Sequence, residues 1–378
     1  MTQTGAQPAL LFDLTLNDEQ RITRETMQRF AETVIKPQTR QIDESSQMSV
    51  DLLQQAHDLG ITLLPVPEEQ GGAGSPRSPV SNILIAEDLG KGDMGVALHI
   101  LAPLGFVNLL IDQGSEAQKA KYLPIFAGES FAPATVAISE PRATSDVHAL
   151  QTKAVKDGAA FVLSGVKGMV PLATTAEHFA IIAEVEGEGP QAFLVEKTAA
   201  GLTTEAQDYL GLHALGLGLV KLENVRVDAS ARLGEGEKTF DYQRLIDLSR
   251  LGACAAAVGT AQALLEHVTQ YANERSAFGE PISHRQAVAF MVANIAIELD
   301  GMRLMVWRAA AQAENGLNFH RQAHLTYINC AERMMQVGTD GVQILGGAGF
   351  LREYFEEMWY RNLRGLAVLG GGFNIWSP

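Results

Sequence analysis

Two segments of the sequence carry groups suited to binding a phosphorylated ligand. Arg275 follows a long helical stretch and is followed by Phe278, and its guanidinium could grip two pyrophosphate oxygens at once. Gly346 and Gly347 come at the end of another helical stretch and would let the backbone approach a ligand closely. Taken singly, the arginine fits a helix-end ion pair equally well, and the glycines fit a helix C-cap. The sequence motifs around Arg275 and the two glycines are therefore needed to assign their role.

A third segment, residues 136–146, contains hydroxyl side chains in a turn. Ser139 and Ser145, together with backbone amides of such a turn, could hold the polar edge of a cofactor without needing a cation. Alone, this segment is ordinary loop sequence. His320 and His324 have a spacing that could ligate a metal on a helix face, but no carboxylate stands where a zinc enzyme would need one. We expect no metal site.

Composition and charge exclude several classes of protein. Hydrophobic residues make up 46% and charged residues 19%, which is typical of a well-buried globular enzyme. The formal net charge of −15, without a dense cluster of lysine and arginine, argues against a nucleic-acid or membrane partner. Two cysteines without metal-ligand or disulfide spacing favour a reducing compartment. The polar N-terminus and the interrupted apolar stretches at 96–111 and 251–265 predict a soluble, cytoplasmic protein.

The hydrophobic period divides the chain into three parts. Residues 1–130 are expected to be an α-helical domain, 131–235 a β domain and 236–378 a helical bundle. In the first part, Asn17 caps a helix that Pro37 should end. Further helices are expected at 50–59, 80–89, 96–113, 245–273, 285–315 and 320–345, and strands at 134–138, 152–155, 160–163, 179–185, 191–195 and 219–227. Few enzyme families have the order helical, β, helical.

Several motifs, spread over nearly the whole chain, resemble those of the acyl-CoA dehydrogenase family and occur in that family's order. Residues 274–282, followed by Gln286, match E-R-x-x-F-G-x-P-I and its glutamine, and residues 343–350 match Q-x-L-G-G-x-G-F. Residues 67–74 are similar to P-E-x-x-G-G-x-G, 118–124 to Q-K-x-x-x-L-P, and 139–146 to T-E-P-x-A-G-S-D. Independent matches in one order make chance a poor explanation.

This resemblance implies an α+β fold with an N-terminal helical domain, a middle β-barrel-like domain and a C-terminal four-helix bundle. It implies FAD as cofactor, an acyl-CoA as substrate, and a homo- or hetero-oligomer (dimer or tetramer) with FAD at the subunit interface. Electron-transferring flavoprotein is the implied redox partner. Asp247 and Arg250 would contact the CoA arm. The implied cofactor-binding residues are Ser139, Ser145, Arg275, Phe278, Gln286, Gln343, Gly346 and Gly347, the last six serving the FAD of a neighbouring subunit.

The resemblance breaks where the family keeps its catalytic base. The family's reaction removes an α-proton from the thioester, and so weak an acid needs a positioned carboxylate. Gly370 occupies the usual position of that glutamate, and Ser249 occupies the position used by a minority of the family. Neither residue can take up the proton on its own. No catalytic residue is therefore assigned.

The wall expected around the flavin ring is altered as well. Met169 stands for a tryptophan and Pro171 for a threonine that donates a hydrogen bond near the reactive nitrogen, while Gly372 stands for a further threonine. Three hypotheses stay open: an FAD-dependent acyl-CoA oxidoreductase with an unrecognised base, a silent subunit that completes an active homologue's FAD site, and non-oxidative chemistry on a CoA thioester.

Overall fold

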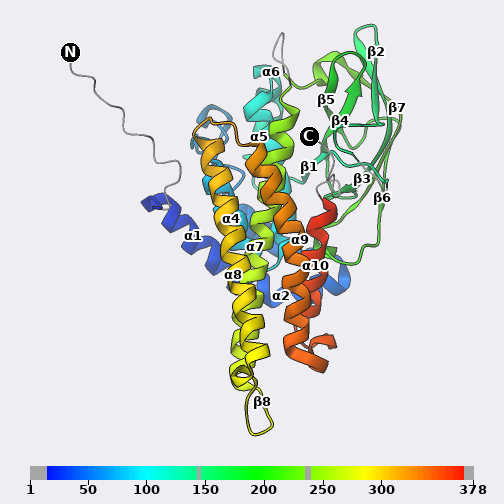
Figure 1. Ribbon diagram of the computed structural model, residues 1–378. Coiled ribbons are helices and arrows are strands. Elements are labelled where there is room, and N and C mark those ends of the chain that lie inside the picture. The colour runs from blue at the N-terminus through cyan, green and yellow to red at the C-terminus, as the bar shows by residue number, and fades with distance from the viewer. Residues whose placement is uncertain (1–14, 143–145, 235–239, 370–378) are drawn as a thin grey trace, which may run out of the picture.

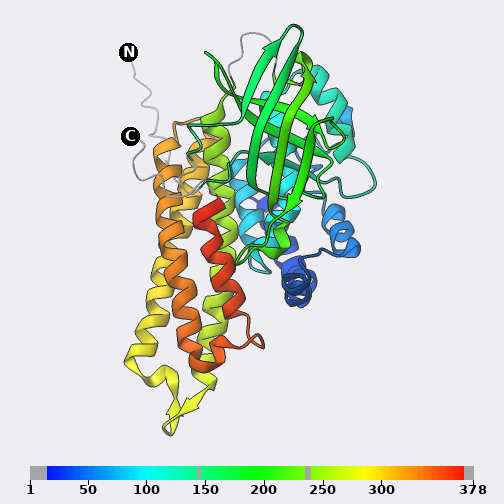
Figure 2. The same ribbon diagram turned by 90° about the vertical axis from the view of Figure 1, so that its right-hand side faces the viewer.

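The structure is a computed structural model that describes residues 15–142, 146–234 and 240–369. It has three parts: N-terminal helices, a curled β-sheet and a bundle of long C-terminal helices (Figure 1). The sheet lies beside one end of the bundle, and a short hairpin forms the opposite end (Figure 2). Mixed α+β architecture in this order is the one expected from the sequence.

The N-terminal part is built from helices whose starts the sequence marks clearly. Asn17 caps α1 (Asp18–Phe30), and a capping box with Gln20 satisfies its first amides. Pro37 does not end this helix as expected. A π-helical turn (Ala31–Ile35) leads directly into α2 (Lys36–Ser45), where the proline sits in the first turn and its missing N–H costs little. The other helices are α3 (Val50–Asp58), α4 (Pro79–Gly90), α5 (Met94–Gln113) and α6 (Glu116–Phe126).

The middle part is one seven-stranded sheet in which β1, β4, β2, β3, β7 and β6 lie in that order and β5 pairs with β4. The expected turn at Gly158 joins β2 and β3 in an antiparallel hairpin. β3 and β7 run side by side with two register shifts, and these irregularities curl the sheet. The strands are β1 (Ala134–Ala137), β2 (Lys153–Asp157), β3 (Ala160–Val170), β4 (His178–Val185), β5 (Gly189–Glu196), β6 (Leu202–Ala206) and β7 (Gly218–Asp228).

The C-terminal part is a bundle of α7 (Tyr242–Glu274), α8 (Gln286–Glu314), α9 (His320–Leu345) and α10 (Glu356–Leu369). Strands β8 (Ser276–Ala277) and β9 (Glu280–Pro281) form the hairpin between α7 and α8. α7 is the central element, because it packs against α4 and α5 as well as against the other bundle helices. One helix therefore joins the N-terminal part to the bundle.

Two helices, α5 and α7, are long and apolar enough to cross a membrane by length and composition. The apolar stretches at 96–111 and 251–265 are too short to span a membrane, but the helices that contain them extend beyond both stretches. In each, 67% of the most apolar window is buried within the protein. This is the pattern of a core helix, whose apolar surface is covered by its own fold.

Buried His99 makes the stability of the fold depend on pH. Burial lowers the pKa of His99 to about 4, against a weaker opposing effect of its hydrogen bond to the carbonyl oxygen of Ala214. Below about pH 6.5 the unfolded chain gains a proton that the folded chain refuses, so this contribution to stability is lost as pH falls from 6.5 toward 4. In His99→Asn, which keeps a donor near Nδ1, this loss should disappear. Urea unfolding at pH 7 and pH 5 should show the wild type losing about 2 kcal/mol more than the variant. Equal losses would contradict the assignment.

Candidate functional site

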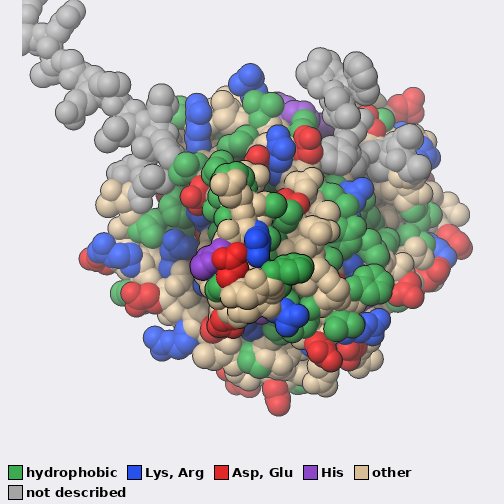
Figure 3. Space-filling model, turned by 60° about the horizontal axis from the view of Figure 1, so that its bottom comes forward, with side chains coloured by type: hydrophobic (Ala, Val, Ile, Leu, Met, Phe, Trp, Pro, Cys, Tyr) green, Lys and Arg blue, Asp and Glu red, His purple; other side chains and the backbone are tan. Residues whose placement is uncertain are grey.

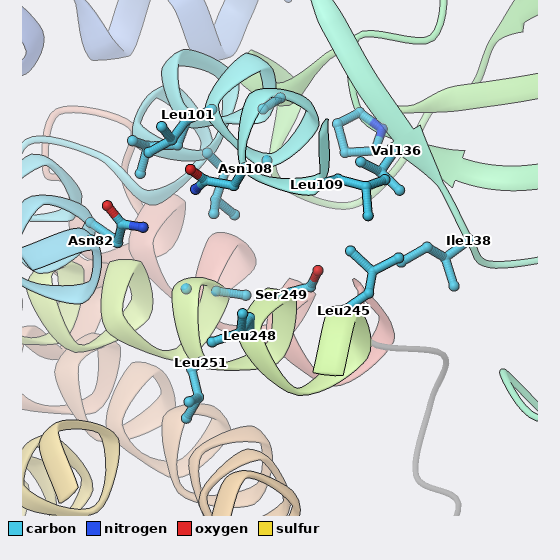
Figure 4. A pocket seen from close by; sticks show the side chains of 18 of the residues that line it. Asn82, Leu101, Asn108, Leu109, Val136, Ile138, Leu245, Leu248, Ser249 and Leu251 are labelled. Atoms are coloured by element: carbon cyan, nitrogen blue, oxygen red, sulfur yellow. The ribbon is translucent and has the colours of Figure 1, made fainter. Parts of the chain in front are cut away.

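A cavity of about 290 Å³ lies where the three parts meet. α4, α5 and α7 form most of its wall, and Figure 4 shows leucine side chains from α5 and α7 facing one another across it. The sheet closes a further side with Val136, Ile138 and Ser139 at the end of β1. The cavity is mainly apolar with a few polar groups, which is the usual make-up of a small-molecule site.

The sheet side of the cavity is shaped by an irregular end of β3. Met169 has a left-handed backbone (φ 52°) at the second register shift, and this turns Met169, Val170 and Pro171 into the cavity wall. Ser139 lies beside them, and its hydroxyl has no partner among the described residues. Leu369, the last described residue, completes this wall. The wall is a flat apolar surface with one available hydroxyl.

A buried ion pair fixes the turn that carries Ser139. The Glu140 carboxylate accepts hydrogen bonds from the amides of Gln151 and Thr152 and from Lys167 Nζ at 3.2 Å. Lys167 is fully buried and also donates to the carbonyl oxygen of Ile138 at 2.9 Å. Burial lowers the pKa of Lys167 to about 8, although Glu140 favours its charged form. These bonds hold residues 138–140 against β3.

Breaking this ion pair from one side should destabilise the protein. Glu140→Gln would leave Lys167 buried without a counter-charge, at a cost of about 3 kcal/mol. The double variant Glu140→Gln/Lys167→Met should regain most of that loss, because it removes the buried charge as well. Urea unfolding of the two variants measures both effects. A single variant as stable as the wild type would show that the pair contributes nothing.

The expected positions of the base hold no carboxylate in the part of the chain that the structure describes. Ser249 lines the cavity, and Gly370, Gly372 and Ser145 lie outside the described residues. The one acidic side chain among the described lining residues is Asp112. Both of its oxygens are held by the Arg77 guanidinium, at 3.0 and 2.9 Å. Asp112 is therefore held in a bidentate ion pair with Arg77.

The two predicted substrate-binding residues lie one turn apart on the same side of α7, where the charge of Arg250 acts on Asp247. Arg250 lines a smaller adjoining hollow together with Ser139, Ser249 and Leu369, and its guanidinium lies 4.8 Å from the ring centre of Tyr327. Asp247 is buried, and both of its carboxylate oxygens lie 3.1 Å from His320 Nδ1. Arg250 is thus placed for a ligand, whereas Asp247 pairs with a histidine that the sequence did not link to it. Among the described residues, no group of three metal-ligating side chains occurs.

The remaining six predicted cofactor-binding residues gather at the hairpin end of the bundle. Phe278, at the hairpin tip, is 95% exposed and has a left-handed backbone (φ 57°). Arg275 is also exposed and has no ion-pair partner among the described residues. Figure 3 brings this lower end forward and shows apolar, basic and acidic side chains mixed on it. The other four are Gln286, Gln343, Gly346 and Gly347, all of which are exposed.

This group of six cannot serve the cavity of the same chain. Ser249 lines the cavity and Arg275, 26 positions later, directly follows the last residue of the continuous helix α7. At about 1.5 Å per residue, that is about 39 Å. The glycines Gly346 and Gly347 have open space where a side chain would be, so another molecule can approach their backbone closely. The structure therefore divides the predicted cofactor residues between two ends of the bundle.

Sequence reasoning missed several groups at the site. No motif reveals the cavity asparagines Asn82 of α4 and Asn108 of α5. The same holds for the ion pair between Asp112 of α5 and Arg77, which lies in the loop before α4. Asn362 of α10 donates a hydrogen bond to buried Asp93 at 2.8 Å. Burial raises the pKa of that carboxyl to about 6. Asn362 therefore ties α10 to the start of α5.

Comparison with known proteins agrees with this architecture. The helical domain, curled sheet and helical bundle around the cavity form a three-domain architecture. Sequence models of the acyl-CoA dehydrogenase N-terminal, middle and C-terminal domains match residues 17–129, 135–225 and 240–375. The chain belongs to the acyl-CoA dehydrogenase family.

Individual relatives match over almost their full length. The probable acyl-CoA dehydrogenase YngJ of Bacillus subtilis is 32% identical over 94% of this chain and 95% of its own. Butyryl-CoA dehydrogenase from Megasphaera elsdenii has a TM-score of 0.88 at 28% identity, covering 96% of this chain and 97% of its own. The FAD complex of PigA has a TM-score of 0.86 at 26% identity, covering 96% of each chain. Together they support FAD as the cofactor.

The described residues fit FAD in two separate places. The flat apolar wall at Met169 and Pro171, with the free hydroxyl of Ser139, suits an isoalloxazine ring. The exposed Arg275, with the open backbone of Gly346 and Gly347, suits a pyrophosphate. Because the two places lie at opposite ends of the bundle, one FAD would span residues from two protomers.

Proposed function

We propose that this chain is a subunit of an FAD-dependent acyl-CoA dehydrogenase and that it completes the flavin site of a neighbouring protomer. The separation of about 39 Å between the cavity and the exposed group at Arg275 carries this proposal. A residue that is exposed, unpaired and far from its own cavity can act on the cofactor only across an interface.

The surface of α8 supports an assembly of more than one chain. Phe290, Ile297 and Leu304 are 62%, 69% and 45% exposed and recur every seven residues. This spacing places them on one stripe of the helix, as in helices that pack against a partner. The stripe begins one turn after Gln286, so it is continuous with the hairpin end. An interface along α8 would bring that end to a second protomer.

The chemistry of this subunit follows from the groups that it holds. Bound FAD would supply a hydride acceptor in α,β-oxidation. Ser139 would donate a hydrogen bond at the edge of the ring, Glu140 and Lys167 keep its turn in place, and the leucine walls exclude water. The one described carboxylate that lines the cavity, Asp112, is held by Arg77 through both oxygens and is therefore a poor candidate for taking up the α-proton. We infer that the desaturating site belongs to a homologous partner that retains the glutamate.

A second candidate is oxidation within this chain's own cavity by a base that the sequence does not identify. The observation that favours it is the open cavity itself: Ser139, Ser249 and Arg250 face one continuous region. For an electron acceptor we propose electron-transferring flavoprotein. A relative from Acetobacterium woodii, 28% identical, is a subunit of a caffeyl-CoA reductase–Etf complex. We also propose a cytoplasmic location, supported by the two free cysteines.

The absorption spectrum of the purified protein tests the proposal. The chain purified alone should be nearly colourless, and co-expression with a homologue that retains the glutamate should yield a yellow complex bleached by an acyl-CoA. Full flavin content in the chain alone, bleached by the same thioester, would replace the proposal with the second candidate. A complex whose flavin content is independent of this chain would contradict both.

A further inference from the structure

Two asparagines interrupt the leucine-rich wall of the cavity. Asn82 of α4 and Asn108 of α5 both line it, and Figure 4 shows their amide groups on the side of the cavity away from Ile138. Oδ1 of Asn108 is buried without a hydrogen-bond partner. Neither side chain bonds to any other described residue. A buried amide left unpaired costs about 1–3 kcal/mol, so a purely hydrocarbon ligand would leave that cost in place.

A third unpaired polar group and the charges around the cavity further restrict the chemical class of ligand that fits it. Thr135 lines the same cavity, and its Oγ1 is buried without a partner. Of the charged groups nearby, Arg77 and Asp112 neutralise each other. Arg244 places its guanidinium 5.5 Å from the ring centre of Phe319. Arg244 is a cation at the cavity without an ion-pair partner among the described residues, whereas Asn82, Asn108 and Thr135 offer neutral hydrogen-bonding groups. The part of the cavity around these three residues suits a neutral polar substituent.

Two glycines in the surrounding helices widen the cavity. Gly105 of α5 and Gly252 of α7 both line it, and a Cβ built on either would touch nothing within 4 Å. No packing constraint in the described structure requires glycine at these positions, and each costs a helix about 1 kcal/mol relative to alanine. Their effect is to leave room at mid-helix for a ligand broader than a straight hydrocarbon chain.

We propose that the acyl group bound here is branched or cyclic and carries a hydroxyl group that meets Asn82 and Asn108. A hydroxyl both donates and accepts, so it can bond Oδ1 of one amide and the NH₂ of the other. The proposal rests on the second candidate of the proposed function, because that candidate brings a CoA thioester into this chain's own cavity. It assigns Asn82, Asn108, Gly105 and Gly252 to substrate selection.

Calorimetric titration of this chain purified alone tests the hydroxyl contact. The probes are ω-hydroxyacyl-CoA thioesters of increasing chain length, each paired with the unsubstituted acyl-CoA of the same length. At the matching length the hydroxylated thioester should bind about tenfold more tightly, the worth of one added hydrogen bond. Asn108→Leu should bring that ratio to about one. Asn82→Leu provides an independent repeat on the facing helix.

A second pair of thioesters tests whether the cavity accepts a cyclic acyl group. Cyclohexanecarbonyl-CoA should lose affinity in Gly252→Val by about tenfold relative to hexanoyl-CoA, and Gly105→Val should act in the same direction. Equal affinities for each hydroxylated pair at every length, or a ratio that survives Asn108→Leu, would overturn the hydroxyl assignment while leaving the thioester function in place. If the glycine variants lose more affinity for hexanoyl-CoA than for the cyclic thioester, the proposal of a broad acyl group is overturned. Failure of every thioester to bind would overturn the second candidate as well.

Discussion

Replacing Arg275 with alanine will lower the FAD content of the assembled protein by at least about tenfold when flavin is limiting. A guanidinium can bond two pyrophosphate oxygens, and each charge-assisted bond is worth about 1.5–3 kcal/mol. Arg275 is exposed and has no described ion-pair partner, so its removal breaks no contact within its own chain. The folded structure should therefore keep its melting temperature while the cofactor is lost. Flavin absorbance after gel filtration, with the melting temperature alongside, measures both.

Two matched variants separate this effect from a general loss of positive charge. Arg275→Lys keeps the charge but not the forked donors, and should retain FAD at an intermediate level. Arg29→Ala removes an exposed arginine from α1 and should leave the flavin content unchanged. Mixing Arg275→Ala with an intact homologue should empty only the flavin site that this chain completes. Full flavin occupancy in Arg275→Ala would refute the role assigned to the hairpin end.

Capping and turn residues in the sequence predicted those helices and strands whose ends are fixed by neighbouring residues in the chain. Asn17 begins α1 as expected because its side chain satisfies the first amides of the helix. Pro37 misled the same reasoning, since the preceding π-helical turn lets the chain continue without a break. Strand β6 and helices α6 and α10 were not predicted, because their short apolar patterns become decisive only when packed against β7, α5 and α9.

The sequence identified individual residues of the candidate site but not how they are placed relative to one another. The motifs identified Arg275 and Ser139 as candidates for one cofactor, but their separation is a property of the 33-residue helix between them. Asn108 and Asp112 look like ordinary positions on an apolar helix. They acquire roles only because α4 packs beside α5 and places Asn82 and Arg77 there. Such pairings depend on tertiary contacts that no single segment encodes.

If this chain's own cavity lacks a base, as we propose, introducing a carboxylate at Ser249 should create α,β-desaturation there. Ser249 is exposed to the cavity, borders the hollow that contains Ser139, Arg250 and Leu369, and lies one helical turn from the open space at Gly252. A glutamate at 249 therefore has room to extend beside the wall assigned to the flavin ring. A positioned general base contributes about 10²–10⁴-fold to such a proton transfer.

With FAD bound, Ser249→Glu should raise the rate of flavin bleaching by an acyl-CoA by at least about 100-fold over the wild-type subunit. The comparison requires a partner whose own glutamate has been changed to glutamine, so that only this chain's cavity can react. Ser249→Gln has nearly the same shape and cannot accept the proton, so it should show no gain. The gain should rise with pH as the new carboxyl ionises. If flavin occupies this cavity and Ser249→Glu still fails to bleach it, the altered wall at Met169 and Pro171 prevents the reaction, because the base would then be present.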